Sequence, residues 1–345
     1  MNNITDKRHI PLLTIILPCY NVSRYIERCL MSIVNQKVDY AIEIIAVNDA
    51  STDETGKILN NLKKRYNNLT IIEHEENQKL TGARSSGMRN ATGVYIMHVD
   101  PDDYLLPDSL NNLFTDNLDW DILITNIQIN YPNHKERRYN LNERIYNLVN
   151  EDDRNLILRE VISGSCFGKV IKRDLVEDLI YQKYHYNLGE DRAFNLEVFL
   201  RAKNILYKNV LLYNYCYNYD SLDRSKTISK TLLNWDNSWI KNVLDIDNKM
   251  IISKDIKNII RKEIERYTIG LLLRISRSKD KRDLFNQWRI FFYKQLSLYG
   301  IKKKIYKLLL AIQSFDIAYP LYLIAFMNID AYFSRISNIL KAKSI

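Results

Sequence analysis

Val94-Tyr-Ile-Met-His-Val-Asp-Pro-Asp-Asp-Tyr-Leu105 decides the fold, because in this stretch a run of apolar, β-prone residues ends in three carboxylates. The run predicts a buried strand with Asp100, Asp102 and Asp103 at its carboxyl end, where open α/β sheets bind their ligands. Carboxylates gathered there repel one another, and a divalent cation shared with substrate phosphates would hold them together. The alternative is a polar turn followed by a helix cap at Asp108, since prolines flank the carboxylates. This stretch alone leaves both interpretations open.

The first half of the chain alternates short apolar runs with helical patterns. The expected strands are Leu13–Leu17, Ala41–Val47, Leu69–His74, Val94–Val99 and Asp121–Asn126. The expected helices are Val22–Gln36, Asp53–Tyr66 and Gly82–Asn90. This order predicts an α/β fold with a mostly parallel sheet and helices on both faces. A further helix from the acidic pair at 190–191 to about Ala202 precedes a strand pattern over Ile205–Tyr219.

Charge divides the 345-residue chain into two parts. Residues 1–226 hold 28 Lys+Arg against 31 Asp+Glu, a net of −3, and residues 227–345 hold 22 against 10, a net of +12. The asymmetry predicts a catalytic domain over 1–226 and a basic, helix-rich region over 227–345. The four cysteines have no paired spacing, which argues against a disulfide framework or a zinc site and favours a reducing cytoplasm.

Aromatic and polar residues follow the first two predicted strands. Tyr20 and Asn21, after Pro18, could stack on a base and hydrogen-bond to it. Asp49 comes where a carboxylate could accept a hydrogen bond from a uracil N–H or a ribose hydroxyl. For Asp53 we prefer a helix-capping role.

Four further residues carry a charge or a ring nitrogen, three of them near predicted helix starts and one inside a predicted strand. Arg84, among small residues near a helix start, could meet a diphosphate, and a surface arginine is the alternative. Glu190 and Asp191 lie at the mouth of a helix, and without the upstream motifs we would interpret them as caps. His98, inside a strand, is expected to be a core histidine with its hydrogen bonds satisfied.

Taken together, these segments resemble family 2 glycosyltransferases of the GT-A fold over roughly residues 11–225. Each segment alone is weak, but the ordered set is highly specific. The segments are Pro18-Cys-Tyr-Asn21, Val47-Asn-Asp-Ala-Ser-Thr-Asp-Glu-Thr55, the helix with Ala83-Arg84, Asp100-Pro-Asp-Asp103 and Gly189-Glu-Asp-Arg-Ala-Phe194.

For the nucleotide, the resemblance implies that Pro18, Tyr20 and Asn21 line its site and that Asp49 holds the base. Lys79 and Ser85 depart from the family pattern, which commonly has Gly and Asn there, so the choice of donor is less firmly implied than the class of reaction.

For the reaction, the resemblance places Asp100 and Asp102 at a metal–diphosphate site that holds Mn²⁺ or Mg²⁺. It makes Asp191 the general base of an inverting displacement, with Glu190 orienting the acceptor or capping its helix. Arg224 and Lys226 fall where relatives often carry a basic residue on a loop that closes over the diphosphate.

The basic C-terminal region combines apolar stripes with clustered lysines, as in Ile301–Ile312 and Ile317–Leu340. This pattern fits an amphipathic helix on an anionic membrane surface, and equally a helix packed on the catalytic domain or in a homo-oligomer. No window is long and apolar enough to span a bilayer. Nucleic acid is not an expected partner, because no recognition motif accompanies the charge.

These observations predict an enzyme that transfers a sugar from a nucleotide donor, expected to be UDP-linked, to a growing capsule, lipopolysaccharide or other lipid-linked glycan. We expect it in the cytoplasm, peripheral on the inner face of the membrane. A nucleotidyltransferase is the alternative enzyme, although residues 11–30 contain no glycine for its phosphate loop, and a dinucleotide oxidoreductase fails on the same ground. A non-catalytic sugar-nucleotide or glycan-binding protein is the third class.

Overall fold

The structure is a computed structural model of the chain. It describes residues 10–111, 113–114, 118–131, 134–137, 139–161, 164–177, 190–216, 229, 233, 254–260, 271 and 274–298. The chain divides into two compact units, Met1–Tyr219 and Asp220–Ile345. The roles predicted for the two parts of the chain stay predictions.

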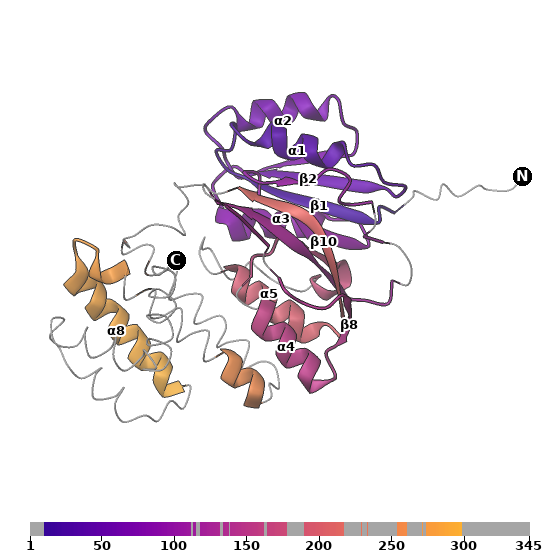
Figure 1. The fold of residues 1–345 in the computed structure, drawn as a ribbon. Coiled ribbons are helices and arrows are strands. Elements are labelled where there is room, and N and C mark those ends of the chain that lie inside the picture. Colours follow the sequence, from indigo (N-terminus) through magenta and orange to yellow (C-terminus); the bar gives the residue numbers. More distant parts are fainter. Residues whose placement is uncertain are drawn as a thin grey trace, which may run out of the picture. The chain divides into compact units, whose positions relative to one another are not determined.

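The first unit alternates strands and helices along the sequence (Figure 1). The strands are β1 Leu13–Cys19, β2 Ile42–Asn48, β3 Leu69–Glu73, β4 Tyr95–His98, β5 Tyr104–Leu105, β6 Ile122–Asn130, β7 Lys135–Arg137, β8 Arg144–Asn147, β9 Lys169–Lys172 and β10 Asn204–Cys216. The helices are α1 Ile26–Val34, α2 Thr55–Lys63, α3 Lys79–Asn90, α4 Glu151–Val161, the 3₁₀ turn η1 Arg173–Leu175 and α5 Glu190–Arg201.

All these strands belong to one sheet in the order β3-β2-β1-β4-β9-β6-β10-β5, with β7 paired to β6 and β8 to β10. β1 lies between β2 and β4 and is parallel to both, and every residue of β1 is buried. Its continuous apolar sequence fits a parallel strand covered on both faces. In Figure 1, α1 and α2 lie on one side of the sheet and α4 and α5 on the other. The predicted α/β fold with a mostly parallel sheet is confirmed.

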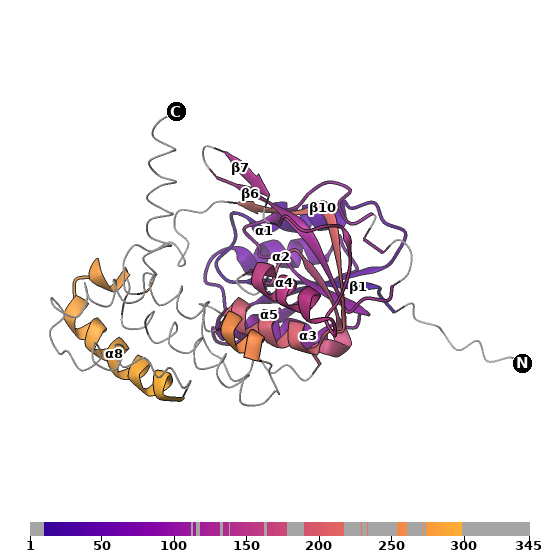
Figure 2. The same cartoon turned by 60° about the horizontal axis from the view of Figure 1, so that its bottom comes forward.

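The antiparallel part of the sheet was not predicted. β9 inserts between β4 and β6 and runs antiparallel to both. Its sequence, Lys-Val-Ile-Lys, is too short for periodicity to separate a strand from a turn. Lys169 at its start is only 1% exposed, because its ammonium donates to the Ser165 carbonyl. β6 and β7 form a hairpin that projects beyond the rest of the sheet in Figure 2.

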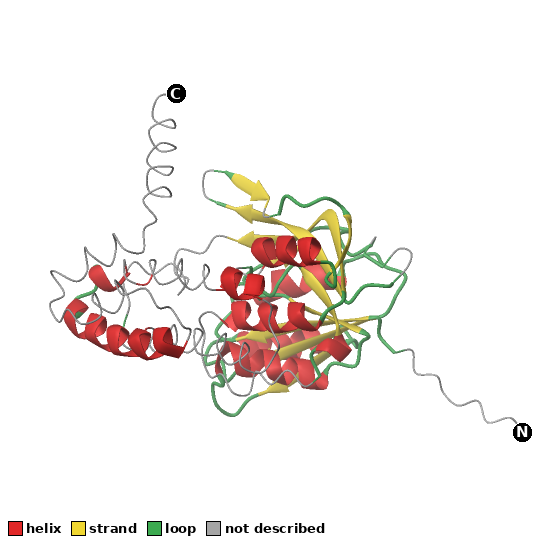
Figure 3. Cartoon of the chain, turned by 90° about the horizontal axis from the view of Figure 1, so that it is seen from below, coloured by secondary structure: helices red, strands yellow, loops and turns green. Residues whose placement is uncertain are grey.

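In the second unit the structure describes the helix α8, Lys281–Leu298, and a helical segment over residues 254–260 (Figure 3). None of the described helices is long and apolar enough to cross a membrane. The segments Ile301–Ile312 and Ile317–Leu340 lie outside the described residues, so their predicted membrane or oligomer contacts stay predictions.

The close packing of α3 on β1 depends on Gly87. A Cβ added at this residue would lie 2.3 Å from Cγ2 of Ile16 in β1. Real carbon atoms do not approach so closely, so any larger residue must push the helix from the strand.

Replacing Gly87 with Ala should therefore lower the free energy of unfolding by about 1–3 kcal/mol, the usual cost of overpacking a core. Urea unfolding followed by circular dichroism measures it. The matched control is Asn61→Ala, at an exposed position in α2, which should change stability by less than about 0.5 kcal/mol. Equal stability of the two variants would contradict the packing argument.

Candidate active site

The loops that follow β1 and β2 are braced against each other. Asn21 adopts the left-handed conformation (φ 53°), which asparagine tolerates. Its Oδ1 accepts a hydrogen bond from the Thr52 N–H (2.8 Å), and its own N–H donates to Ser51 Oγ (3.1 Å). The Oδ1 of Asn21 is thus engaged in holding the loop, and the predicted contact of its amide with a base stays a prediction.

Pro18 and Tyr20 differ in their access to solvent. Pro18 is buried in β1 beside Val47 of β2, whereas Tyr20 is 48% exposed at the end of the strand. An exposed ring at the carboxyl edge of the sheet can receive a planar ligand. The contacts predicted between these residues and a base stay predictions.

Asp53 was predicted to cap α2, but the cap position is Glu54, and Asp53 supports the start of the helix from the preceding residue. Its carboxylate accepts from the Thr55 N–H (3.0 Å), at the first residue of the helix, and from the Ser23 N–H (3.1 Å). Burial acts to raise the pKa of Asp53, but these hydrogen bonds outweigh it and lower the pKa to about 2.

Asp49 is nearly buried, 2% exposed, and held from the side of β3 and α3. His74 Nδ1 lies 2.6 Å from its Oδ1, and the Gln78 N–H donates to the same oxygen (2.8 Å). Next to Gln78, Lys79 has φ 66°, the left-handed conformation that glycine adopts without strain. The family's usual glycine near this position therefore has a backbone explanation.

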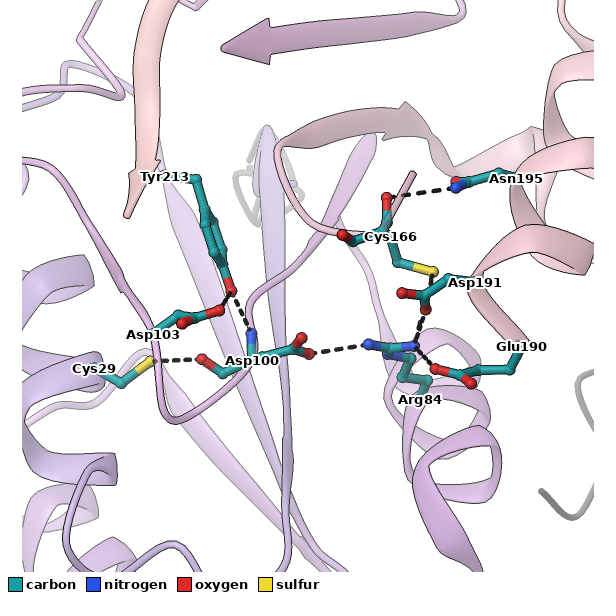
Figure 4. A network of polar contacts seen from close by, with 10 residues as sticks. Cys29, Arg84, Asp100, Asp103, Cys166, Glu190, Asp191, Asn195 and Tyr213 are labelled. Atoms are coloured by element: carbon teal, nitrogen blue, oxygen red, sulfur yellow. Dashed lines mark hydrogen bonds and ion pairs between the residues drawn. The ribbon is translucent and has the colours of Figure 1, made fainter. Parts of the chain in front are cut away.

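Arg84 joins the end of β4 to the start of α5 (Figure 4). Its guanidinium donates to Asp100 Oδ1 through one nitrogen (2.9 Å), and through the other to Glu190 Oε1 (3.0 Å) and Asp191 Oδ1 (2.5 Å). The side chain of Arg84 is 1% exposed, so it is not the surface arginine of the alternative interpretation. The fold thus gathers three predicted site carboxylates around one buried cation.

One cation does not satisfy three carboxylates, and the pKa values of Asp100, Glu190 and Asp191 shift in different directions. Burial raises the pKa of Asp100 to about 6 against the pull of Arg84. Burial, then the neighbouring Asp191, raises the pKa of Glu190 well above its usual range. Burial also acts to raise the pKa of Asp191, but Arg84 outweighs it and holds this pKa well below the usual range. The surroundings therefore favour the ionised form of Asp191 and the protonated form of Glu190.

The two members of the pair also differ in exposure. The side chain of Asp191 is 24% exposed and that of Glu190 only 7%. A substrate hydroxyl can therefore reach Asp191 more readily than Glu190.

Cys166 is a neighbour of the site that sequence reasoning missed. Its thiol donates to Asp191 Oδ1 (3.0 Å), and burial raises the pKa of the thiol so that it stays protonated. The spacing of the cysteines indicates only that they are not paired, and an isolated Cys gives no signal in the sequence of a contact with a residue 25 positions away.

His98 is buried as expected, but the expectation of satisfied hydrogen bonds was wrong. Among the described residues, neither ring nitrogen has a hydrogen-bond partner. Its ring meets Phe194 edge-on, with centroids 5.7 Å apart. Burial, reinforced by Arg84, lowers the pKa of His98 to about 3, so the ring is neutral.

Asp103 has a structural position distinct from that of Asp100. It is fully buried and accepts from the Tyr213 hydroxyl (2.7 Å) and the Cys216 N–H (2.7 Å), which fastens the loop after β4 to β10. The Tyr213 hydroxyl in turn accepts from the Asp100 N–H (3.0 Å). Asp103 therefore orients the backbone of the site.

The donors at Asp100 and Asp102 fit a divalent cation that is shared with a substrate. Both are carboxylates, the ligand type that Mg²⁺ and Mn²⁺ prefer, and Arg84 uses only Oδ1 of Asp100. Burial raises the pKa of Asp100 even beside Arg84, so a second cation at this carboxylate would favour its ionised form. Over the described part of the chain, no group of three or more His, Cys, Asp or Glu residues is arranged to hold a metal. A cation here would need oxygen ligands from its substrate.

Arg224 and Lys226 lie outside the described residues, so their predicted closure over a diphosphate stays a prediction.

Comparison with known proteins agrees with this architecture. A crystal structure of S. aureus TarS in complex with UDP-GlcNAc aligns with a TM-score of 0.63 at 19% identity, over 94% of this chain and 92% of that one. At this identity the likeness shows the fold alone, and it defines a GT-A-type α/β protein. Residues 14–180 match the model described as Glycosyl transferase family 2. Residues 14–180 are therefore a domain of glycosyl transferase family 2.

Curated relatives carry the same kind of domain within longer proteins. Glycosyltransferase GlyA of Streptococcus pneumoniae serotype 4 is 31% identical over 252 residues, 69% of this chain and 34% of that protein. Poly(ribitol-phosphate) beta-glucosyltransferase of Bacillus spizizenii is 32% identical over 198 residues, 56% of this chain and 30% of that protein. The chain thus spans about a third of the length of these relatives.

Replacing Arg84 with Met should lower the free energy of unfolding by about 3–5 kcal/mol, because removing one partner leaves buried carboxylates uncompensated. Adding Glu190→Gln and Asp191→Asn to Arg84→Met should recover part of the loss, since Asp100 is then the only carboxyl of the cluster left without its cation. Urea unfolding of the single and triple variants measures both.

The control for these variants is Lys57→Met, which breaks the ion pair between Lys57 and Glu54. The two side chains of this pair are 73% and 68% exposed. Exposed pairs contribute little, so this variant should keep nearly full stability. The role of Arg84 as the shared cation would be refuted if Arg84→Met were as stable as Lys57→Met.

Proposed function

We propose that this chain is an inverting glycosyltransferase that moves a sugar from a UDP-linked donor to a hydroxyl of a cell-surface glycan. The observation that carries the proposal is the Arg84 cluster, which brings an ionised carboxylate, Asp191, beside the strand-end carboxylate Asp100. Direct displacement at an anomeric carbon needs both a group that accepts the hydroxyl proton and a site that receives the departing diphosphate. The cluster places candidates for both on one edge of the sheet.

The donor would lie across the carboxyl edge, with its base near Asp49 and Tyr20 and its diphosphate near Asp100. UDP-GlcNAc in the structurally similar TarS supports a UDP-linked donor. Arg84 is close to the proposed diphosphate position, and its guanidinium contacts three carboxyl groups and the Cys166 sulfur.

Asp100 and Asp102 would hold the Mn²⁺ or Mg²⁺ that the family implies. Bound there, the ion would supply Lewis-acid stabilisation of the negative charge on the diphosphate. The protein's own part is to fix Asp100: Tyr213 and Cys29 contact its backbone, and Arg84 its carboxylate.

Asp191 is the proposed general base. Its opposite pKa shift from Glu190 is the pattern that assigns different roles to two adjacent carboxyls. Asp191 would take the proton from the acceptor hydroxyl. The more buried Glu190 would hold and orient this hydroxyl. Because one displacement occurs, the anomeric configuration inverts.

The acceptor class rests on the relatives. The Bacillus spizizenii protein is named for a poly(ribitol-phosphate) acceptor, which supports a surface glycan as the acceptor here. We extend this to teichoic-acid-like, capsular, lipopolysaccharide or lipid-linked chains, made in the cytoplasm at the inner face of the membrane. The basic region over 227–345, with 22 Lys+Arg against 10 Asp+Glu, would contact that anionic surface or a second copy of the chain.

Asp191→Asn should reduce UDP release from UDP-sugars by a factor on the order of 10²–10⁴, the usual contribution of a positioned base. Binding of UDP, measured by calorimetry, should stay nearly unchanged. The control Glu197→Gln makes the same carboxylate-to-amide change on the same helix, at a residue paired with Arg201 (2.8 Å), and should keep full activity.

Full activity of Asp191→Asn would remove Asp191 as the base. No UDP release by the unchanged protein from any UDP-sugar, together with normal UDP binding, would instead indicate a non-catalytic nucleotide-sugar-binding protein.

Chelation by EDTA should abolish UDP release, and added Mn²⁺ or Mg²⁺ should restore it. Asp102→Asn should raise the Mn²⁺ concentration needed for half-maximal activity by at least tenfold, because a neutral amide is a weaker ligand for a hard cation. The control Asp108→Asn alters an exposed carboxylate with φ 53°, a conformation asparagine accepts, and should leave the Mn²⁺ requirement unchanged. Activity that persists in EDTA would contradict a metal at this site.

A further inference from the structure

We infer that His74 is a positioning residue that makes Asp49 a hydrogen-bond acceptor for uracil and against cytosine. The inference rests on the proposed function, because it concerns how the same site would choose its nucleotide. It begins from a residue that neither the motifs nor the charge pattern of the sequence singled out.

Within the described part of the chain, both hydrogen bonds to the Asp49 carboxylate reach the same oxygen. His74 Nδ1 lies 2.6 Å from Oδ1, and the Gln78 N–H donates to Oδ1 over 2.8 Å. The side chains of His74 and Asp49 are only 6% and 3% exposed. Oδ2 is therefore the atom left for a ligand.

The far side of His74 is fixed as well. Its Nε2 lies 2.8 Å from Ser86 Oγ, and Arg89 donates to this same oxygen over 3.2 Å. With a neutral ring, Ser86 donates to Nε2 and the ring proton stays on Nδ1. With a charged ring, both nitrogens carry protons. In either state Nδ1–H faces Asp49, so the carboxylate stays an acceptor.

An acceptor at this place discriminates between bases by elementary hydrogen-bond chemistry. Uracil presents an N–H at ring position 3, whereas neutral cytosine presents a lone pair at the same atom. A lone pair against a nearly buried carboxylate leaves two acceptors facing each other, which is unfavourable. Sites that hydrogen-bond a substrate reject analogues with the wrong pattern most strongly when the protein groups are buried.

The two ring nitrogens allow the role to be dissected. Asparagine places its amide nitrogen near the position of Nδ1, and glutamine near that of Nε2. His74→Asn can thus keep the donor to Asp49, His74→Gln keeps only the contact with Ser86, and His74→Phe keeps neither. A role in packing alone would order these variants by volume instead.

The experiment is calorimetric titration of the full chain with UDP and with CDP, at fixed Mn²⁺, for the unchanged protein and the three variants. We expect the unchanged protein to prefer UDP, and His74→Phe and His74→Gln to weaken UDP binding by about tenfold or more with little effect on CDP. His74→Asn should retain most of the preference. Thermal unfolding of each variant confirms that it is folded, and Ser86→Ala, which removes only the outer support, serves if His74→Phe does not fold.

Several results would overturn the inference. They are an equal loss of UDP and CDP binding in His74→Phe, an unchanged ratio of UDP affinity to CDP affinity in that variant, or tighter UDP binding by His74→Gln than by His74→Asn. If the unchanged protein bound UDP normally, these results would leave the proposed glycosyltransferase standing. Failure of the unchanged protein to bind UDP at all would overturn the proposed function, and this inference with it.

Discussion

The ion pairs of Arg84 are the interaction on which the site depends. This one buried guanidinium contacts Asp100, Glu190 and Asp191, which come from distant parts of the chain. Desolvation makes a buried arginine costly by itself, and the three carboxylates are equally costly without it. Neither side can be buried alone, so β4, α3 and α5 have to meet in one arrangement.

Helix α3 transmits this constraint to the nucleotide side of the sheet. The same helix carries Arg84, which holds the reacting carboxylates, and Ser86, which supports His74 behind Asp49. Gly87 of α3 lies against Ile16 of β1 with no space for a side chain. A helix fixed so tightly to the central strand keeps both halves of the site in register. This explains why α3 is buried on nearly all sides despite its polar sequence.

Which features of the fold and site could be predicted depends on how far apart in the sequence the interacting residues lie. Strand runs such as Leu13–Leu17 were found because burial on both faces of a parallel strand leaves a continuous apolar signature. Asp49, Asp100 and Asp191 were placed correctly at strand ends and at a helix start, because parallel strands bring their carboxyl ends to one edge. The partners of Arg84 were not predictable from pattern, since Glu190 is 106 residues away. The one available signal was an arginine within a helix of small residues, Thr81–Met88, a composition that suggests a buried helix.

The distribution of charge explains why the two members of the acidic pair differ. Three carboxyl groups around one guanidinium exceed its charge, and burial together with the neighbouring Asp191 favours the protonated form of Glu190, the least exposed of the three. Asp191 stays ionised because Arg84 and the Cys166 thiol both donate to it. The same hydrogen bonds that favour the ionised form of Asp191 also make it a weaker base, because a hydrogen-bonded anion binds protons less readily. Asp100 keeps a pKa raised to about 6 by burial even though Arg84 donates to it, so further positive charge beside this carboxylate would favour its ionised form.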